Sequence, residues 1–274
     1  MAVLYPTMTA STYLLAGQGP ELQHLHLQAR VWEPAARALV ADLELPFGAR
    51  VLDVGCGALG WLRVLADRVP DGVVVGTDID GSLLEAATAT CQEAGYDHVR
   101  VIEDDLFHSA LPAGMFDLVH ARFQLCPLGR APEQVASYRR LVKPGGLLVL
   151  EEPDTRTWTY EPYAAATAHL IGRLGQAVGA AGGDLDMGRR LPALLREHGL
   201  EPQVRTHVLG LEAGHPYLGL PLQFAASLQQ RLDRAMGTAA ADDLRAAAAA
   251  ELADPARRGT TLTLVQAWAR VPAA

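Results

Sequence analysis

Short apolar runs alternate with stretches of helical periodicity over residues 51–151, and this alternation restricts the fold more than any other feature. The apolar runs cover residues 51–54, 73–77, 99–102, 116–121 and 147–151. The helical stretches between them cover residues 61–69, 82–94 and 132–141. Strands that alternate with helices pair in parallel. The pattern therefore predicts an α/β fold, with a mostly parallel sheet and helices on both of its faces.

The rest of the chain is expected to add helical segments around this core. Helices are predicted over 11–43, 161–199, 222–236 and 239–252, and further strands over 204–211 and 260–271. The expected division is an N-terminal helical lid (1–45), a cofactor-binding core (46–155) and a remainder (156–274). The remainder would complete the sheet and carry a helical substrate cap in two insertions, 156–199 and 213–258.

Composition disfavours several functions. The net charge of −8 argues against a nucleic-acid partner, because neutralising phosphates requires a basic surface. No apolar run approaches the ~20 residues that cross a bilayer, and no signal-peptide pattern opens the chain, so we expect a cytoplasmic protein without membrane contact. The three cysteines, Cys56, Cys91 and Cys126, fit neither a disulfide framework nor a zinc site, and no metal is expected.

The strongest chemical signal is the segment 51–60, Val-Leu-Asp-Val-Gly-Cys-Gly-Ala-Leu-Gly. A strand runs directly into glycines and then into a helix, whose N-terminus presents unpaired N–H groups to a ligand. Gly55, Gly57 and Gly60 also satisfy the dinucleotide fingerprint of dehydrogenases. Asp78, after the next strand, would bind ribose hydroxyls in either case. The loop by itself therefore allows an NAD-dependent dehydrogenase or a methyltransferase.

Three features favour the methyltransferase. Asp53, at the mouth of the loop, suits the ammonium group of a methionine moiety and would repel a pyrophosphate. Asp104 and Asp105 follow the third strand, where a carboxylate would accept the exocyclic amine of adenine. A Lys-Pro-Gly-Gly turn at 143–146 precedes the fifth strand.

With these motifs in order at successive strand ends, residues 50–155 resemble the class I S-adenosylmethionine-dependent methyltransferases. The likeness is to bacterial small-molecule enzymes of the ubiquinone and natural-product type, and it extends to Gly-Thr-Asp at 76–78 and Phe-Asp-Leu-Val at 116–119. The resemblance implies a Rossmann-like sheet of seven strands whose last strand inserts antiparallel between two others. S-adenosyl-L-methionine is then the expected cofactor, and S-adenosyl-L-homocysteine the product.

The resemblance also implies cofactor-binding residues at the strand ends and in the N-terminal segment. Tyr13 would pack over the cofactor, and its methionine portion would lie against Asp53, Gly55 and Gly57. Its ribose would bind to Asp78, and its adenine would contact Ile79, Asp105 and Leu106. The sulfonium would lie beside Ala121 and Arg122. Two positions depart from the family pattern. Leu59 stands where a glycine is usual, and Pro127 where a histidine is frequent.

Methyl transfer from a sulfonium requires alignment and exclusion of water, and a general base when the nucleophile is a hydroxyl. Glu152, after the fifth strand, and His24, on the N-terminal helix, are the candidate bases, so oxygen is the favoured acceptor atom over nitrogen or carbon. Aromatic residues are expected to wall a pocket for a small, natural-product-like substrate: Phe123, Trp158, Tyr163 and Phe224. A monomer or homodimer is expected.

Two alternatives stay open at this point. One is an NAD-dependent oxidoreductase. The other is a protein of methyltransferase fold that binds the cofactor but catalyses a different reaction or acts as a regulator, since a fold does not fix a function.

Overall fold

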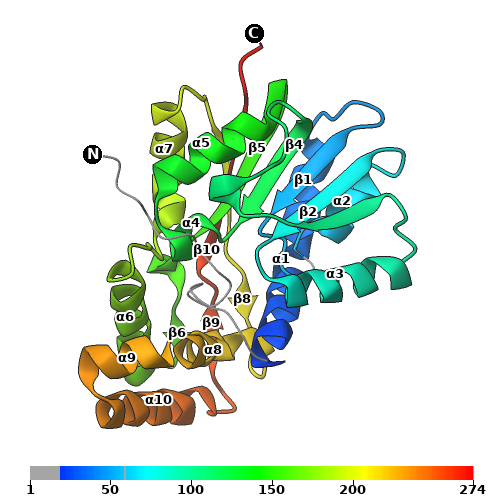
Figure 1. Cartoon of the computed structure of the whole chain (residues 1–274). Helices are drawn as coiled ribbons and strands as arrows, with labels where there is room; N and C mark the ends of the chain where they lie inside the picture. Colours follow the sequence, from blue (N-terminus) through cyan, green and yellow to red (C-terminus); the bar gives the residue numbers. More distant parts are fainter. Residues whose placement is uncertain (1–18, 59, 274) are drawn as a thin grey trace.

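The main sheet places its strands in the order β3-β2-β1-β4-β5-β10-β7 (Figure 1). The computed structural model describes residues 19–58 and 60–273, with side chains from residue 25 onward. The strands are β1 (Arg50–Val54), β2 (Val73–Asp78), β3 (Val99–Glu103), β4 (Phe116–Arg122), β5 (Val142–Asp154), β7 (Gln203–His207) and β10 (Thr263–Arg270). β1 to β5 pair in parallel, whereas β10 is antiparallel to both β5 and β7. The predicted sheet, with its antiparallel last strand between two others, is confirmed.

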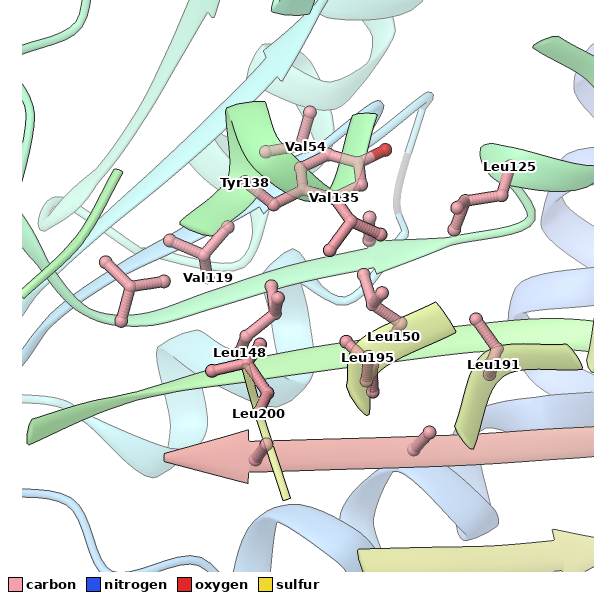
Figure 2. Packing of buried hydrophobic residues seen from close by; sticks show 14 of the residues in the cluster. Val54, Val119, Leu125, Val135, Tyr138, Leu148, Leu150, Leu191, Leu195 and Leu200 are labelled. Carbon is pink, nitrogen blue, oxygen red and sulfur yellow. The ribbon is translucent and has the colours of Figure 1, made fainter. Parts of the chain in front are cut away.

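Apolar residues alternate along the central strands and fill the two faces of the sheet separately. In β4, Leu118 packs into one cluster and Val119 into the other, because successive side chains of a strand point to opposite faces. Leu148 and Val149 divide in the same way in β5. Figure 2 shows the first cluster, in which Tyr138 and other residues of the flanking helices cover β4 and β5.

Helices cover both faces. One face carries α1 (Gly19–Asp42), α2 (Leu62–Arg68) and α3 (Gly81–Glu93), and the other carries α5 (Ala131–Leu141) and α7 (Leu191–Glu197). A short helix, α4 (Leu125–Leu128), follows β4 directly. None of the described helices combines the length and the apolar character that a bilayer crossing requires.

A separate helical layer lies beyond the end of the sheet where β5 finishes (Figure 1). It comprises α6 (Ala165–Gly179), α8 (Leu220–Ser227), α9 (Gln229–Met236) and α10 (Thr238–Leu252), which share an apolar cluster of their own. A small antiparallel sheet of β6 (Tyr160–Glu161), β9 (Arg258–Thr260) and β8 (Gly210–Leu211) joins this layer to the core. We call these helices and strands the cap.

The structure corrects three of the expected boundaries. The first insertion does not extend to residue 199, because Leu191 and Leu195 of α7 pack on the main sheet rather than in the cap. The strand predicted over 204–211 divides into β7 and β8, which belong to different sheets. The strand predicted over 260–271 is found as β10. The N-terminal helix is more than a lid, since Leu39 and Val40 of α1 are buried in the core.

Candidate active site

The backbone conformation of the loop between β1 and α2 favours glycine at three positions. Gly55, Gly57 and Gly60 have φ angles of 65°, 56° and 40°, which side chains disfavour. A Cβ atom on Gly60 would lie 2.4 Å from the carbonyl oxygen of Cys56. A Cβ atom on Gly55 would lie 2.2 Å from the side chain of Gln124, which follows β4 and covers the loop. The sequence motif is thus explained by positive φ angles at all three glycines and by backbone crowding at Gly60.

Two adjoining cavities open around this loop. The large cavity, about 1260 Å³ including its open mouth, extends from the loop to the cap. The small cavity, about 510 Å³, lies over the ends of β2 and β3. Gly55, Asp78 and Gln124 line both cavities, so these residues mark the place where the two meet.

Most of the residues predicted to bind the cofactor line one or both cavities. The large cavity is lined by Asp53, Gly55, Gly57, Asp78 and Arg122, and the small cavity by Gly55, Asp78, Ile79, Asp105 and Leu106. Gln124 was missed by the sequence reasoning, which gave no signal for a glutamine folded back over a glycine. Its Nε2 donates to the carbonyl oxygen of Gly55 at 3.2 Å.

The two aspartates at the ends of β2 and β3 are held by backbone donors. Asp78 accepts the N–H of Gly57 (2.9 Å) and of Asp80 (3.0 Å), and burial raises its pKa above the ordinary value. Asp105 accepts the N–H of Phe107 (3.0 Å) and pairs with His108 through Nδ1 (2.7 Å). Each carboxylate is therefore fixed in place before any ligand binds, which lowers the entropic cost of binding.

A buried ionic cluster lies beneath the large cavity, on the face of the sheet covered by α2. His120 Nδ1 is 2.7 Å from Asp53 Oδ1, and His120 Nε2 is 3.5 Å from Glu151 Oε2. Trp61 stacks on the His120 ring at 3.8 Å. The Trp61 backbone N–H donates to Asp53 (2.8 Å), and its indole Nε1–H donates to Glu151 (2.9 Å). The cluster thereby ties the glycine loop to β4 and β5.

Charge and burial oppose each other in this cluster. Burial by itself would lower the pKa of His120, but the carboxylates of Asp53 and Glu151 raise it above the usual value. Burial likewise would raise the pKa of Glu151, but His120 and Arg122 lower it. Asp53, predicted to face an ammonium group, has a donor on each oxygen already, so it also has a structural role that the sequence did not reveal.

The sequence predicted Glu152 as a general base in the cavity, but the structure places its side chain outside both cavities. Its oxygens accept the backbone N–H groups of Gln124 (2.9 Å), Leu125 (2.7 Å) and Cys126 (3.0 Å) at the start of α4. The side chain is fully buried, lines neither cavity, and has its pKa raised by burial to about 8. The physical reason is that β5 continues to Asp154, so Glu152 lies within the strand on the same face as Leu150.

Replacing Glu152 with alanine is expected to lower the free energy of unfolding by about 3 kcal/mol or more, because three N–H groups, two of them buried, lose their acceptor. Chemical denaturation measures the change. Glu201→Ala is the matched control, since the Glu201 side chain is 94% exposed, and it is expected to cost no more than about 0.5 kcal/mol. Equal stability of the two variants would contradict the role of Glu152 in fixing α4.

Three other predicted residues, Ala121, Trp158 and Tyr163, are placed differently from the expectation. Ala121 is buried in the core opposite His120 and lines neither cavity. Trp158 is buried against Phe224, with ring centroids 6.1 Å apart, and only Phe224 lines the large cavity. Tyr163 is 75% exposed. Phe123 lines the large cavity as expected, with an unusual φ of 55°.

Two of the predicted site residues, Tyr13 and His24, belong to the N-terminal segment. Tyr13 lies outside the described residues. His24 lies in α1, one helical turn before Gln28, but its side chain is outside the description. Leu25 and Gln28 of the same helix line the large cavity, so α1 does form one of its walls.

Comparison with known proteins assigns the core of the chain to a protein family. A family model described as a methyltransferase domain matches residues 51–146. The segment 51–146 is a class I methyltransferase domain. The cofactor of this class is S-adenosyl-L-methionine. The topology agrees, because the dinucleotide-binding dehydrogenase sheet has the strand order 3-2-1-4-5-6, whereas here the antiparallel β10 separates β5 from β7.

The alignment with a curated relative is longer than the match to the family model. Nocamycin O-methyltransferase from Saccharothrix syringae is 36% identical over 136 residues, which cover 48% of this chain and 49% of that protein. The matched segments thus span about half the length of such curated relatives. In the part of the chain that the structure describes, no group of three or more His, Cys, Asp or Glu residues is placed to hold a metal ion.

Solved structures share the fold. A putative methyltransferase from Bacillus halodurans C-125 superposes with a TM-score of 0.59 at 16% identity, covering 87% of this chain and 99% of that one. The [4+2]-cyclase SpnF superposes with a TM-score of 0.53 at 20% identity, covering 88% of this chain and 82% of that one. At these identities the likeness shows the fold alone.

Proposed function

We propose that the protein transfers the methyl group of S-adenosyl-L-methionine to an oxygen atom of a small, largely apolar organic molecule. One observation carries the proposal: the two cavities meet at Gly55 and Asp78, which line both of them. A single elongated ligand would place its adenine in the small cavity, its ribose at Asp78 and its methionine portion along the glycine loop. Its reactive centre would then face the part of the large cavity that extends into the cap.

The residues present fit this cofactor. The backbone of the glycine loop is accessible to a ligand, since Gly55 and Gly57 both line the large cavity. Asp78 supplies fixed acceptors for ribose hydroxyls, and Ile79, Asp105 and Leu106 give the small cavity an apolar wall and an acceptor for adenine. When bound, the cofactor supplies an activated methyl group on a sulfonium.

The part of the large cavity nearest the cap is mostly apolar. Its walls include Phe123, Leu185, Phe224, Leu228 and Leu262. Apolar walls with few polar groups are typical of sites for small organic ligands, and they exclude the water that would compete with transfer. That a relative is an O-methyltransferase for nocamycin supports oxygen as the acceptor atom.

Titration calorimetry with S-adenosyl-L-homocysteine tests the cofactor half of the proposal. We expect a one-to-one complex in the micromolar range and no saturable binding of NADH. Absence of binding at millimolar S-adenosyl-L-homocysteine would overturn it. Incubation of candidate acceptors with methyl-labelled cofactor tests the transfer, and it separates methylation from the alternative that this fold catalyses another reaction, as it does in the [4+2]-cyclase SpnF.

A further inference from the structure

The guanidinium of Arg122 is the unusual group in the large cavity. Arg122 ends β4, lines the cavity and has a side chain that is only 7% exposed. Its nearest described carboxylate is Glu151, at 3.8 Å, which is too long for a hydrogen bond. Glu151 instead accepts hydrogen bonds from Trp61 and Gln266. Among the described residues no acceptor takes a hydrogen bond from this guanidinium, although it has five N–H groups.

The other titratable groups that line the large cavity are already engaged or are poor bases. Both oxygens of Asp53 and both oxygens of Asp78 accept hydrogen bonds from the protein. His120 is fully buried, with Nδ1 on Asp53. Burial raises the pKa of the Cys56 and Cys126 thiols well above the ordinary value. The described lining therefore offers a cation that donates no hydrogen bond to a described carboxylate, and it lacks an uncommitted general base.

We infer that the acceptor oxygen is already ionised when it binds, as a carboxylate or an acidic enol or phenol, and that Arg122 holds this anion. The inference rests on the proposed function and specifies its substrate class. A neutral alcohol would have to lose a proton on attack, whereas an oxyanion does not. A buried guanidinium without a hydrogen-bonded partner is suited to a planar anion such as a carboxylate.

The transfer step balances without an added base. A lone pair of the acceptor oxyanion forms the new O–CH₃ bond as the S–CH₃ bond breaks, and the electron pair of that bond remains on sulfur. The negative oxygen and the positive sulfonium become a neutral ester or ether and a neutral thioether. No proton is released. Arg122 orients the anion and is not consumed.

The position of Arg122 favours the acceptor over the carboxylate of the cofactor. Its guanidinium lies 5.9 Å from the ring centroid of Phe123, and its charge lowers the pKa of Tyr217 against the larger, opposing effect of burial. Tyr217 belongs to the apolar cluster that contains Leu262, which lines the large cavity together with Phe123. The guanidinium therefore lies towards the wall that an acceptor would contact.

The test measures binding to the protein saturated with S-adenosyl-L-homocysteine, using naphthoate and its neutral analogue naphthamide as probes. We expect the wild type to bind naphthoate at least about 10-fold more tightly than naphthamide. Arg122→Gln should reduce this ratio to below about twofold while leaving S-adenosyl-L-homocysteine affinity within about twofold, and Arg122→Lys, which keeps the charge, should retain an intermediate preference. Arg196→Gln, an exposed residue of α7, is the matched control and should behave as the wild type.

Each other outcome has a definite meaning. Equal affinities of the wild type for the two probes, including no binding of either at millimolar concentration, would overturn the inference while the proposed function stands. A large loss of S-adenosyl-L-homocysteine affinity in Arg122→Gln would overturn it as well, because Arg122 would then hold the cofactor. If the wild type itself fails to bind S-adenosyl-L-homocysteine, the proposed function fails and the inference with it.

Discussion

Replacing Asp78 with alanine is expected to weaken binding of S-adenosyl-L-homocysteine by about 100-fold or more. The Asp78 carboxylate lines both cavities at the place where they meet. Two hydrogen bonds from ribose hydroxyls to a charged acceptor contribute about 1.5 kcal/mol each at least, and their joint loss corresponds to that factor. The variant also removes the acceptor of the Gly57 N–H, which loosens the loop beside the methionine portion.

Titration calorimetry measures this effect, with Asp71→Ala as the matched control. Asp71 is exposed and lies in the turn before β2, at the opposite end of the strand from Asp78. It should bind S-adenosyl-L-homocysteine as the wild type does. A loss smaller than fivefold in Asp78→Ala would show that the ribose lies elsewhere, and it would remove the central support for the proposed cofactor position.

The largest effect on stability is expected for His120→Gln, which should lower the free energy of unfolding at about pH 6 by about 3–5 kcal/mol. The substitution removes the only positive charge among the described residues within hydrogen-bonding distance of Asp53. It also removes the ring that stacks on Trp61. Two buried carboxylates, Asp53 and Glu151, then share a site without their central counter-ion, which is unfavourable in a low dielectric.

The pH dependence of stability has a defined sign. Because the folded-state pKa of His120 lies above its unfolded value of about 6.5, its contribution is complete below about pH 6.5 and is lost as the pH rises through the raised pKa. Glu151 has a lowered pKa, so its contribution is present above about pH 4.5 and is lost as the pH falls. The wild type should therefore become less stable above about pH 6.5. In His120→Gln the slope should be smaller, and what remains should come from the raised pKa of Glu152.

Denaturant unfolding at a series of pH values checks both expectations. His169→Gln is the control, since His169 is an exposed residue of α6, and it should keep the stability and the slope of the wild type. The same slope in His120→Gln and in the wild type would mean that His120 is neutral in the folded protein. The ionic cluster would then be a hydrogen-bonded cluster only.

The proposed substrate class depends on parts of the chain that lie outside the methyltransferase domain. Residues 51–146 supply the glycine loop, Asp78 and Arg122, whereas Phe224 and Leu262 come from the remainder. In the proposed function the core therefore supplies the cofactor site and the anion site, and residues of the cap such as Phe224 supply part of the apolar walls. Exchange of cap residues should change which acceptor binds without changing the affinity for the cofactor.

The sequence by itself determined the core of this protein. Strand periodicity and the glycine spacing are local properties, so they located the strand ends and placed Gly55, Asp78 and Asp105 at the same edge of the sheet. That edge is common to all parallel strands, which is why residues far apart in the chain could be predicted to line adjoining cavities. The antiparallel last strand followed from the resemblance to a known family rather than from the residues themselves.

Only the tertiary structure decided which polar residues at that edge line the cavities. Glu152 and Arg122 both stand near strand ends, but β10 pairs with β5 as far as Asp154, so Glu152 is enclosed within the sheet while Arg122 reaches the cavity. His120 meets Glu151 across two neighbouring strands, and Tyr163 is left exposed by the packing of the cap. Local patterns specify which side chains alternate along a strand, whereas long-range pairing determines which elements cover them.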